Sequence, residues 1–375
     1  MVEVQLQNIS KSYARKRVLQ KVDLKFEKGK FSVVFGSPVS GKSVLMRLIM
    51  GLESPDSGSI FLRGREVTGL PAGVRNFGYV PQSFALYPHY RVFDNIAYPL
   101  TLARKSREAI RGRVEPLAKK LKIDALLDKY PNQLSGGEKQ RVALARGIVK
   151  DSEVFILDDP LVGLDFKLRE QLFVDLRLML SEIDGTFIYT TSDPLETLAL
   201  ADDVFVLDQG EIVDQGSVDH VYEEPSNLRA FQLLGFPGAN TIPGSLVGGI
   251  CRSAFGEFGV ELADSAGQEV RREVTIGFRP EAVLLDEEAK TAGALRFDAR
   301  ELLREDLGAE TIFYFEAAGF RYVGYWSNGS APPQLQEVFQ AGLSIRDLVI
   351  FESATGRRLG RGKDSHVGSA VGKNS

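Results

Sequence analysis

The chain has 375 residues, of which 43% are hydrophobic and 26% charged, and its net charge is -4. This composition is typical of a globular protein of two or three domains, and the charge gives no general attraction to nucleic acid. The single cysteine, Cys251, excludes an internal disulfide and a cysteine-rich metal site. No apolar run approaches the roughly 20 residues of a membrane span, and the first residues have the pattern of a strand rather than a signal peptide. We therefore expect a cytoplasmic chain, soluble by itself, whose membrane link goes through a partner.

The first two strands flank a single aromatic residue of interest. Residues 2–9 and 22–26 alternate apolar and polar side chains, as strands with one buried face do. Tyr13 lies between them; it can stack on a nucleotide base or pack against the sheet, and the sequence leaves both interpretations open. The strands expected around residues 59–63 and 77–80 complete a small β layer.

A glycine-containing loop lies between an apolar strand, 31–35, and an apolar helix, 44–50. The loop fits the pattern G-x-x-x-x-G-K-[ST], which cradles nucleotide phosphates. A helix start offers unpaired N–H groups to an anion, Lys42 would reach the β- and γ-phosphates, and the Ser43 hydroxyl would ligate Mg²⁺. The loop consists of Gly36, Ser37, Pro38, Val39, Ser40, Gly41, Lys42 and Ser43.

The next segments carry a glutamine and an aromatic loop. Gln82 follows the strand at 77–80, where its carboxamide can ligate Mg²⁺ or orient the attacking water, although a surface glutamine is the commoner meaning. The stretch 84–90 is unusually aromatic for a loop, and is either buried by its own domain or a docking surface. Residues 104–129 have a helical pattern with a solvated basic face.

A second glycine motif opens the helix that runs through 142–149. Ser135 is a good N-cap, and Gly136 and Gly137 let backbone N–H groups approach an anion closely. Glu138 lies three residues after Ser135, so a capping box is the simpler interpretation. Because a capping box does not need two glycines, we favour an anion-binding role.

Two carboxylates end a buried parallel strand at 154–157. Sites in parallel sheets lie at the carboxyl ends of strands, so Asp158 would hold Mg²⁺, through water, and Asp159 would polarise a water for attack on the γ-phosphate. A helix from Leu164 to about Glu182 and a strand at 186–191 follow. This alternation of strands and helices predicts a mostly parallel α/β sheet.

The composition changes near residue 235, after which short strands and turns predominate. Their spacing predicts a small β-barrel or sandwich, and the tail from about Arg357 has too few apolar residues to fold. The expected strands are 245–250, 258–262, 273–277, 295–302, 310–316, 320–325 and 347–352.

Four motifs in one order, the loop 36–43, Gln82, 134–138 and 155–160, together resemble the ATP-binding subunit of an ABC transporter over about residues 2–235. The resemblance implies an α/β P-loop NTPase (ABC ATPase) domain at 1–235 with a helical subdomain at about 89–150. It further implies a small all-β OB-like barrel, of the regulatory TOBE type, at 236–356, and a disordered tail at 357–375. The stretches that resemble the carbohydrate-importer branch are 86–89, 93–97, 160–161, 164–169, 276–281 and 307–311.

The resemblance also implies a sandwich of two ATPase subunits that encloses ATP and Mg²⁺. Tyr13 would stack on adenine, the loop 36–43 would hold the phosphates, and Gln82 and Asp158 would lie at the metal. The 135–137 motif would close on the γ-phosphate of the partner's site.

The same family has membrane partners. The aromatic loop after Gln82 would receive a coupling helix, and closure of the sandwich would drive two permease subunits between access states. An external or periplasmic binding protein would take part indirectly, with no nucleic acid partner. The chain would then be peripheral, at the cytoplasmic face of the cell membrane. The resemblance favours uptake of a sugar or a polyol such as glycerol or glycerol phosphate over a metal or an anion.

Three departures from the family pattern touch one site. The family has glutamate where Asp159 stands, and the shorter aspartate would misplace the attacking water, at a typical cost of about 10²–10⁴ in rate. The family has histidine where Ser192 stands, and serine carries no cation. Pro38 removes one N–H from the phosphate loop, and Val39, where glycine is frequent, resists positive φ. The loop therefore bends differently or grips phosphate less well.

These departures lead to the hypothesis that the chain binds ATP but hydrolyses it poorly, and pairs with a different, competent ATPase subunit. The alternatives are a homodimer whose aspartate suffices, a non-transport ABC ATPase, and a regulatory subunit. The sequence encodes neither the transported substrate nor the ligand of the C-terminal domain.

Overall fold

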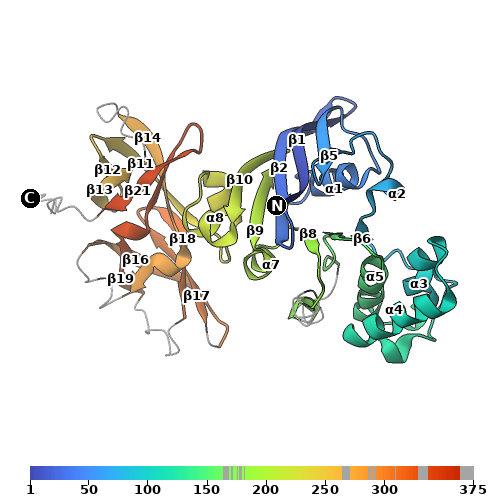
Figure 1. Cartoon of the computed structure of the whole chain (residues 1–375). Helices are drawn as coiled ribbons and strands as arrows, with labels where there is room; N and C mark the ends of the chain where they lie inside the picture. The colour runs from blue at the N-terminus through green and yellow to red at the C-terminus, as the bar shows by residue number, and fades with distance from the viewer. Residues whose placement is uncertain are drawn as a thin grey trace, which may run out of the picture. The chain divides into compact units, whose positions relative to one another are not determined.

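A computed structural model describes residues 1–163, 169, 172–174, 176, 180, 182–263, 271–285, 289, 293–308, 310–327 and 337–363. The chain forms two compact units, Met1–Asp219 and His220–Ser375 (Figure 1). None of the helices in the described ranges is long and apolar enough to cross a membrane. The helix predicted from Leu164 to Glu182 lies mostly outside the described residues.

An antiparallel sheet of order β2-β1-β4-β5 opens the first unit. Its alternating residues bury one face, which includes Val4, Leu6 and Ile60, as the alternating sequence pattern predicts. The strands are β1 (Val2–Tyr13), β2 (Lys16–Glu27), β4 (Ser57–Leu62) and β5 (Arg65–Glu66).

A second sheet has the order β10-β9-β3-β8-β7-β6 and is parallel except for β10. Every residue of β7 and β8 is buried, as in parallel strands covered on both faces, including the three threonines of β8. The strand predicted at 77–80 lies in this sheet and not in the small β layer, because Val80 pairs with Leu157 in a parallel ladder. The strands are β3 (Phe31–Phe35), β6 (Gly78–Val80), β7 (Val154–Asp158), β8 (Thr186–Thr191), β9 (Asp203–Asp208) and β10 (Glu211–Ser217).

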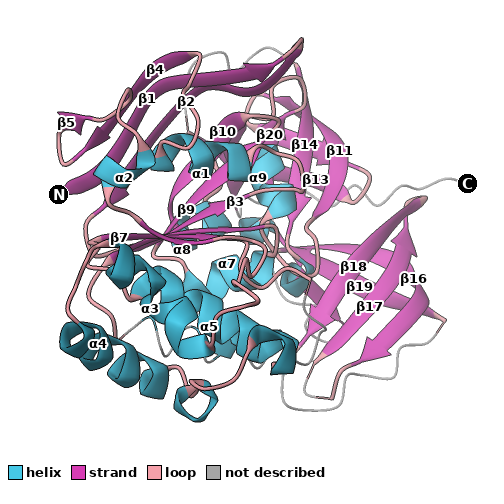
Figure 2. Ribbon diagram, turned by 90° about the vertical axis from the view of Figure 1, so that its right-hand side faces the viewer, coloured by secondary structure: helices cyan, strands magenta, loops and turns pink. Residues whose placement is uncertain are grey.

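Helix α1 (Lys42–Met50) packs between the two sheets of the first unit. Leu45, Met46 and Ile49 share one apolar core with strands of both sheets. Figure 2 shows α1 on one side of the parallel sheet and α7 (Pro194–Leu200) on the other. This packing fixes the start of α1 at the carboxyl ends of the parallel strands. The short helix α2 spans Ala72–Arg75.

The helices between Val92 and Ile148 have a separate apolar core, which contains Val92, Ile96, Val142 and Ala145. The helix predicted over 104–129 is shorter, because Ser106 caps its start and 3-10 turns follow its end. The elements are α3 (Val92–Leu102), α4 (Arg107–Lys120), η1 (Asp124–Leu126), η2 (Pro131–Gln133) and α5 (Gly136–Ile148).

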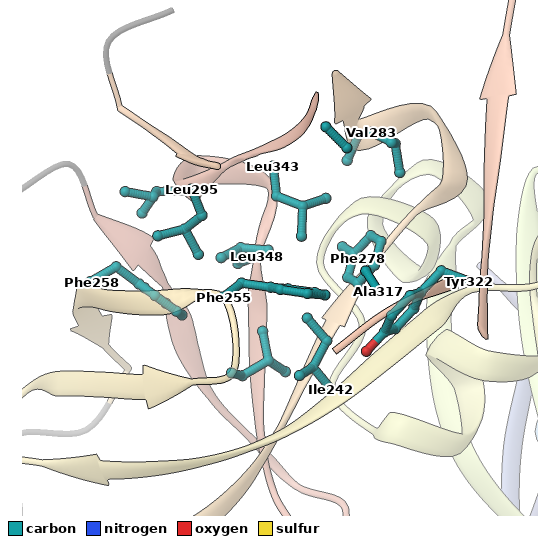
Figure 3. Packing of buried hydrophobic residues seen from close by; sticks show 14 of the residues in the cluster. Ile242, Phe255, Phe258, Phe278, Val283, Leu295, Ala317, Tyr322, Leu343 and Leu348 are labelled. Carbon is teal, nitrogen blue, oxygen red and sulfur yellow. The ribbon is translucent and has the colours of Figure 1, made fainter. Parts of the chain in front are cut away.

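The second unit contains a closed barrel of order β11-β12-β13-β21-β20-β14 and a sheet of order β15-β19-β16-β17-β18. The two share an aromatic core around Phe255, Phe278 and Tyr322 (Figure 3). This arrangement confirms the predicted α/β P-loop domain followed by a small all-β barrel domain. The strands are β11 (Asn240–Val247), β12 (Ile250–Ser253), β13 (Gly256–Leu262), β14 (Arg272–Phe278), β15 (Val283–Leu285), β16 (Ala294–Asp306), β17 (Thr311–Ala317), β18 (Phe320–Trp326), β19 (Val338–Ser344), β20 (Val349–Glu352) and β21 (Arg358–Lys363).

The predicted start of the disordered tail is wrong, because Arg358–Lys363 is strand β21 and pairs with β13 and β20. Its buried residues alternate with polar ones, which a composition argument does not detect. Residues 364–375 lie outside the described residues. Strands β15 and β19 are also absent from the sequence prediction. The 3-10 turns η3 and η4 span Pro280–Ala282 and Ile345–Asp347.

The division between the units falls after Asp219, ahead of the boundary predicted at 235. The reason is that α9 (Leu228–Leu233) and most of α8 (Val218–Glu223) belong to the second unit. The buried Arg279 donates to the carbonyl oxygens of Tyr222, Phe231 and Leu234 at 3.0, 2.9 and 2.5 Å. Its guanidinium also lies over the rings of Tyr222 and Phe231.

Candidate functional site

The loop between β3 and α1 closes a tight turn. The Ser40 N–H donates to the Ser37 carbonyl oxygen at 3.2 Å, with Pro38 and Val39 at the two central positions. Val39 has φ +68°. Proline at the first central position and positive φ at the second are the features of a type II turn, which normally has glycine at the second. The loop therefore keeps the bend that a glycine would favour, although Val39 was predicted to resist it.

The backbone strain of that bend is located at Val39. Its side chain is 88% exposed, so no packing offsets the strain of a β-branched residue in the left-handed region. Strain of about 1–3 kcal/mol of this kind persists only where the surrounding structure holds it, which is often at a functional site.

The loop approaches its neighbours too closely for side chains at its start. A Cβ placed on Gly36 would lie 2.1 Å from the Leu207 carbonyl oxygen and 2.9 Å from Ser40 Oγ. The Gly36 N–H donates to the Thr191 carbonyl oxygen at 3.3 Å, which ties the loop to β8. Ser40 Oγ is buried and has no hydrogen-bond partner among the described residues. A narrow turn with an unsatisfied buried hydroxyl fits a loop that receives a phosphate oxygen.

Lys42 extends along the inside of this loop. Its Nζ donates to the carbonyl oxygens of Gly36 and Ser37 at 2.7 and 3.1 Å. Burial lowers the pKa of the ammonium, while Asp159 and then Asp158 oppose that shift. The cation therefore lies where it can be shared between the loop and a bound phosphate.

Asp158 joins β7 to α1 and β8. Its Oδ1 accepts from Ser43 Oγ at 3.2 Å and from Thr190 Oγ1 at 2.8 Å. Burial, and secondly the charge of Asp158, raise the pKa of Tyr79 to about 12. A hydroxyl beside a carboxylate is an oxygen donor pair of the type that Mg²⁺ prefers. The residues therefore fit a metal held by Ser43 and Asp158.

Asp159 follows directly in a left-handed conformation, with φ +48°. Its N–H donates to Thr190 Oγ1 at 2.9 Å and to the Thr190 carbonyl oxygen at 3.1 Å, which holds that conformation. Burial, followed by the negative charge of Glu196, raises the pKa of Asp159 to about 6, although Lys42 acts in the opposite direction. Asp159 is therefore a carboxyl group with a weakened tendency to ionise.

The strand register brings Gln82 and Ser192 to the same edge. Val80 of β6 pairs with Leu157 of β7, so Gln82 leaves its strand beside the aspartates. Phe35 of β3 pairs with Thr191 of β8, so Ser192 leaves beside the phosphate loop. Both side chains are exposed.

Tyr13 is placed at the end of β1 with its hydroxyl engaged. The phenol donates to Glu53, whose other carboxylate oxygen accepts from Arg47 Nε at 2.6 Å. The Tyr13 side chain remains 41% exposed. The ring is therefore oriented by its hydroxyl and not buried by sheet packing, which favours the base-stacking interpretation.

A buried polar cluster beneath Ser192 was not detected in the sequence. Glu196 accepts from Tyr189 Oη at 2.8 Å, Thr191 Oγ1 at 2.6 Å and Arg169 at 2.7 Å. Arg169 also donates to Asp193 at 2.5 Å. Only the spacing of Asp193, which caps α7, and Glu196 gives a local signal. The cluster fixes the segment that carries Ser192.

The second glycine motif is a complete capping box at the start of α5. Ser135 Oγ accepts from the Glu138 N–H at 3.3 Å, and Glu138 Oε2 accepts from the Ser135 N–H at 2.7 Å. The bond to the Ser135 backbone lowers the pKa of Glu138. Ser135 is exposed, Gly136 is half-buried and Gly137 is buried. The capping interpretation is therefore correct locally, and it leaves the start of α5 at the surface, where an anion can approach.

Comparison with known proteins supplies the family. A family model described as ABC transporter matches residues 19–162. The molybdate/tungstate import ATP-binding protein WtpC of Pyrococcus horikoshii is 38% identical, over 82% of this chain and 86% of its own. The sn-glycerol-3-phosphate import ATP-binding protein UgpC of Chromobacterium violaceum is 34% identical, over 99% and 100%. The trehalose/maltose import ATP-binding protein MalK of Thermococcus litoralis is 32% identical, over 96% and 100%.

A solved structure shows the same fold over part of this chain. The ATP-binding cassette MJ0796, as a dimer in a post-hydrolysis state bound to ADP and Pi, has a TM-score of 0.52 and 27% identity. The match covers 57% of this chain and 98% of that chain. The phosphate loop at a parallel-sheet edge and these relatives define an ABC-type ATPase. The chain belongs to the ATP-binding proteins of the ABC transporter family.

Proposed function

We propose that the chain is the ATP-binding subunit of an ABC importer, peripheral at the cytoplasmic face of the cell membrane. It binds ATP with Mg²⁺, pairs with a second ATPase subunit, and drives two permease subunits. An external or periplasmic binding protein delivers the substrate to these permease subunits. No nucleic acid takes part. The observation that carries this proposal is the meeting of Lys42, Asp158 and Asp159 beside a phosphate loop at the carboxyl edge of the sheet.

The chain's own residues divide the work in this proposal. Lys42 and the start of α1 bind the β- and γ-phosphates, and Tyr13 orients the base. Ser43 and Asp158, with Gln82, would hold Mg²⁺, which would supply neutralisation of the phosphate charge. Asp159 orients the attacking water.

The transported substrate is a sugar or a polyol, including glycerol phosphate. The support is that the UgpC and MalK relatives match nearly the whole chain, with the β unit included. The WtpC relative, named for molybdate and tungstate, matches a smaller share. Uptake of labelled glycerol 3-phosphate, maltose and molybdate by cells with and without the chain tests this assignment. Loss of molybdate uptake alone would overturn it.

The chain's own site is degenerate in this proposal, so its ATPase partner is a different protein. Asp159 is one methylene shorter than the family's glutamate, so it would misplace the attacking water. Ser192 supplies no cation at the γ-phosphate. The start of α5, in contrast, keeps the exposed serine and glycines that would serve the partner's site.

ATP turnover by the isolated chain tests the degenerate site. The double variant Asp159→Glu/Ser192→His should hydrolyse ATP about 10²-fold faster or more, since it restores the family's base and cation. The matched control is Asp203→Glu/Ser57→His, which makes the same changes away from the loop. Brisk turnover by the unmodified chain would contradict the proposal.

A gentle purification of the tagged chain from its own membranes, with mass spectrometry for stoichiometry, tests the partners. A permease pair with a second, different ATPase supports the asymmetric pair. A permease pair with two copies of this chain means that Asp159 and Ser192 power transport themselves. Purification with no membrane protein would favour a non-transport regulatory ATPase.

A further inference from the structure

The aromatic segment Phe84–Tyr90, here named the docking loop, is built around a turn. The Tyr90 N–H donates to the Tyr87 carbonyl oxygen at 3.1 Å, across Pro88. Tyr87 packs against Tyr98 of α3 with ring centroids 4.6 Å apart. Ala85 has φ +46°, a conformation that a residue with a Cβ seldom adopts. A strained residue in a surface loop requires contacts that hold it in place.

The first set of contacts comes from α3. Asn95 is fully buried, and its Oδ1 accepts from the Tyr87 N–H at 2.8 Å. Its Nδ2 lies 3.1, 3.0 and 3.1 Å from the carbonyl oxygens of Tyr87, Tyr90 and Arg91. One side-chain amide thus satisfies both ends of the turn.

The second set of contacts comes from α5. Arg146 donates to the Ala85 carbonyl oxygen at 2.6 Å through one terminal nitrogen and to the Phe84 carbonyl oxygen at 2.9 Å through the other. Its guanidinium lies 5.6 Å from the centroid of the Tyr87 ring. Burial lowers the pKa of Arg146, so the cation is drawn out of water for these contacts. Only a planar fork reaches two successive carbonyls in this way, which a lysine cannot reproduce.

The two helices that hold the loop are themselves one packed body. Val92 and Ile96 of α3 share an apolar core with Val142 and Ala145 of α5. Arg146 lies on the helix that begins at Gly136, directly after Ser135. A short, regular helix transmits a displacement of one end to the other.

We propose that Arg146 and Asn95 are positioning residues that fix the docking loop to α3 and α5 as one rigid piece. A membrane permease seated on the loop then senses the position of the start of α5, and so senses whether the ATP sandwich is closed. The inference rests on the proposed importer function for the identity of the partner. The fixing of the loop itself does not depend on that function.

The first measurement is hydrogen–deuterium exchange of the full, isolated chain. Arg146→Lys and Asn95→Asp should each speed exchange in residues 84–90 by about tenfold or more, since each removes charge-assisted or buried bonds to the loop. The control is Arg141→Lys, because Arg141 lies on the same helix and donates to the Leu121 carbonyl oxygen at 3.2 Å, away from the loop. Thermal unfolding shows whether each variant is folded. Because the two substitutions lie on separate helices, one variant still tests the proposal if the other does not fold. Unchanged protection in both would overturn the proposal.

The second measurement is binding of the full chain to membranes from cells that lack it, with and without a non-hydrolysable ATP analogue. In the wild type the analogue should shift the half-saturating concentration, and Arg146→Lys should bring the ratio of the two concentrations to about one. Arg141→Lys should keep the wild-type ratio. Affinity of the isolated chain for the analogue should stay within about twofold, because Arg146 lies on α5 and not at the phosphate loop.

The outcomes separate the two proposals. A loosened loop with an unchanged ratio would overturn the coupling role of Arg146. A wild type that binds membranes without any effect of nucleotide would do the same. A wild type that binds no membrane protein would overturn the importer function, and with it the docking role, while the exchange data decide by themselves whether the loop is fixed.

Discussion

The phosphate-loop edge and the start of α5 are both anion-binding candidates, but they are built differently. At the edge, Lys42 and Asp158 are 7% and 4% exposed, and Val39 and Asp159 have φ of +68° and +48°. At the start of α5 the backbone of Ser135 is extended, with φ -65°, and its capping bonds are complete. Strain and buried charge are concentrated at one candidate and absent from the other.

This difference in strain and buried charge affects how each half of a composite ATPase site responds to substitution. A satisfied helix start depends on local bonds and is stable whether or not a nucleotide is near. The edge depends on the coupled charges of buried Lys42 and Asp158 and half-buried Asp159, so a change such as glutamate to aspartate alters the interactions of all three. We infer that substitutions impair the phosphate-loop edge more easily than they impair the start of α5. The following changes test that contrast, from the largest expected effect to the smallest.

Lys42→Ala should weaken ATP binding by at least about 100-fold, since it removes a buried cation and leaves two carboxylates facing the phosphates. Titration with a fluorescent ATP analogue measures the effect. Lys30→Ala is the control, because Lys30 precedes the same strand and pairs with Asp203. A loss below tenfold would show that the nucleotide is held elsewhere.

Asp159→Asn should raise the unfolding midpoint of the first unit by about 2–4 °C at pH 8, assuming about 1 kcal/mol after allowance for solvent screening. The pKa of Asp159 is raised, chiefly by burial, from 3.8 to about 6. The destabilisation of the folded chain by this carboxyl therefore grows as the pH rises between these two values, and it levels off above the higher one. Asparagine tolerates the left-handed backbone.

The pH dependence of this gain identifies its cause. Below about pH 3 the gain should vanish, because the carboxyl is then largely protonated in the folded and the unfolded chain alike. Asp128→Asn, with a side chain 95% exposed, is the control and should show no such dependence. A gain that is equal at about pH 3 and at pH 8 would rule out titration as its source.

Ser135→Ala should destabilise the first unit by about 1 kcal/mol, the usual cost of a lost N-cap. Ser106→Ala is the matched control, since Ser106 Oγ accepts from the Ala109 N–H at 3.2 Å as the cap of α4. Both variants should unfold at similar temperatures. Only Ser135→Ala should also slow ATP turnover by the purified pair of ATPase subunits, and equal turnover by both variants would argue against a role at the partner's phosphate.

Val39→Gly should raise the unfolding midpoint slightly, by about 1–2 °C. Relief of the left-handed valine gains about 1–2 kcal/mol, while the added freedom of glycine in the unfolded chain costs about 0.5–1 kcal/mol. Val74→Gly, an exposed valine within helix α2, should instead lower the midpoint. A lower midpoint for Val39→Gly would show that the bend is not strained.

Local patterns in the sequence predicted the parallel strands and the loop well, because apolar runs and fixed spacing carry that information. The same patterns placed Gln82 and Ser192 after strands, and the register brings those strand ends together. They missed Asn95, Arg146 and Glu196, because a side chain that bonds to a distant backbone leaves no periodic trace. They also misjudged Val39, where the surrounding fold overrides a residue preference.

Arg279 has a consequence for dissecting the chain into parts. Since it binds the last carbonyls of α8 and α9, a gene fragment ending at residue 235 would carry these helices without the arginine that completes them. The β fragment would in turn lose Phe231, which packs on Phe351. If the chain were divided at residue 235, a loss of activity caused by misfolding would be mistaken for a loss of regulation. A cut after Ser217 leaves β10, α8 and α9 undivided and lies beside the division between the units, so separate expression of the two units should begin there.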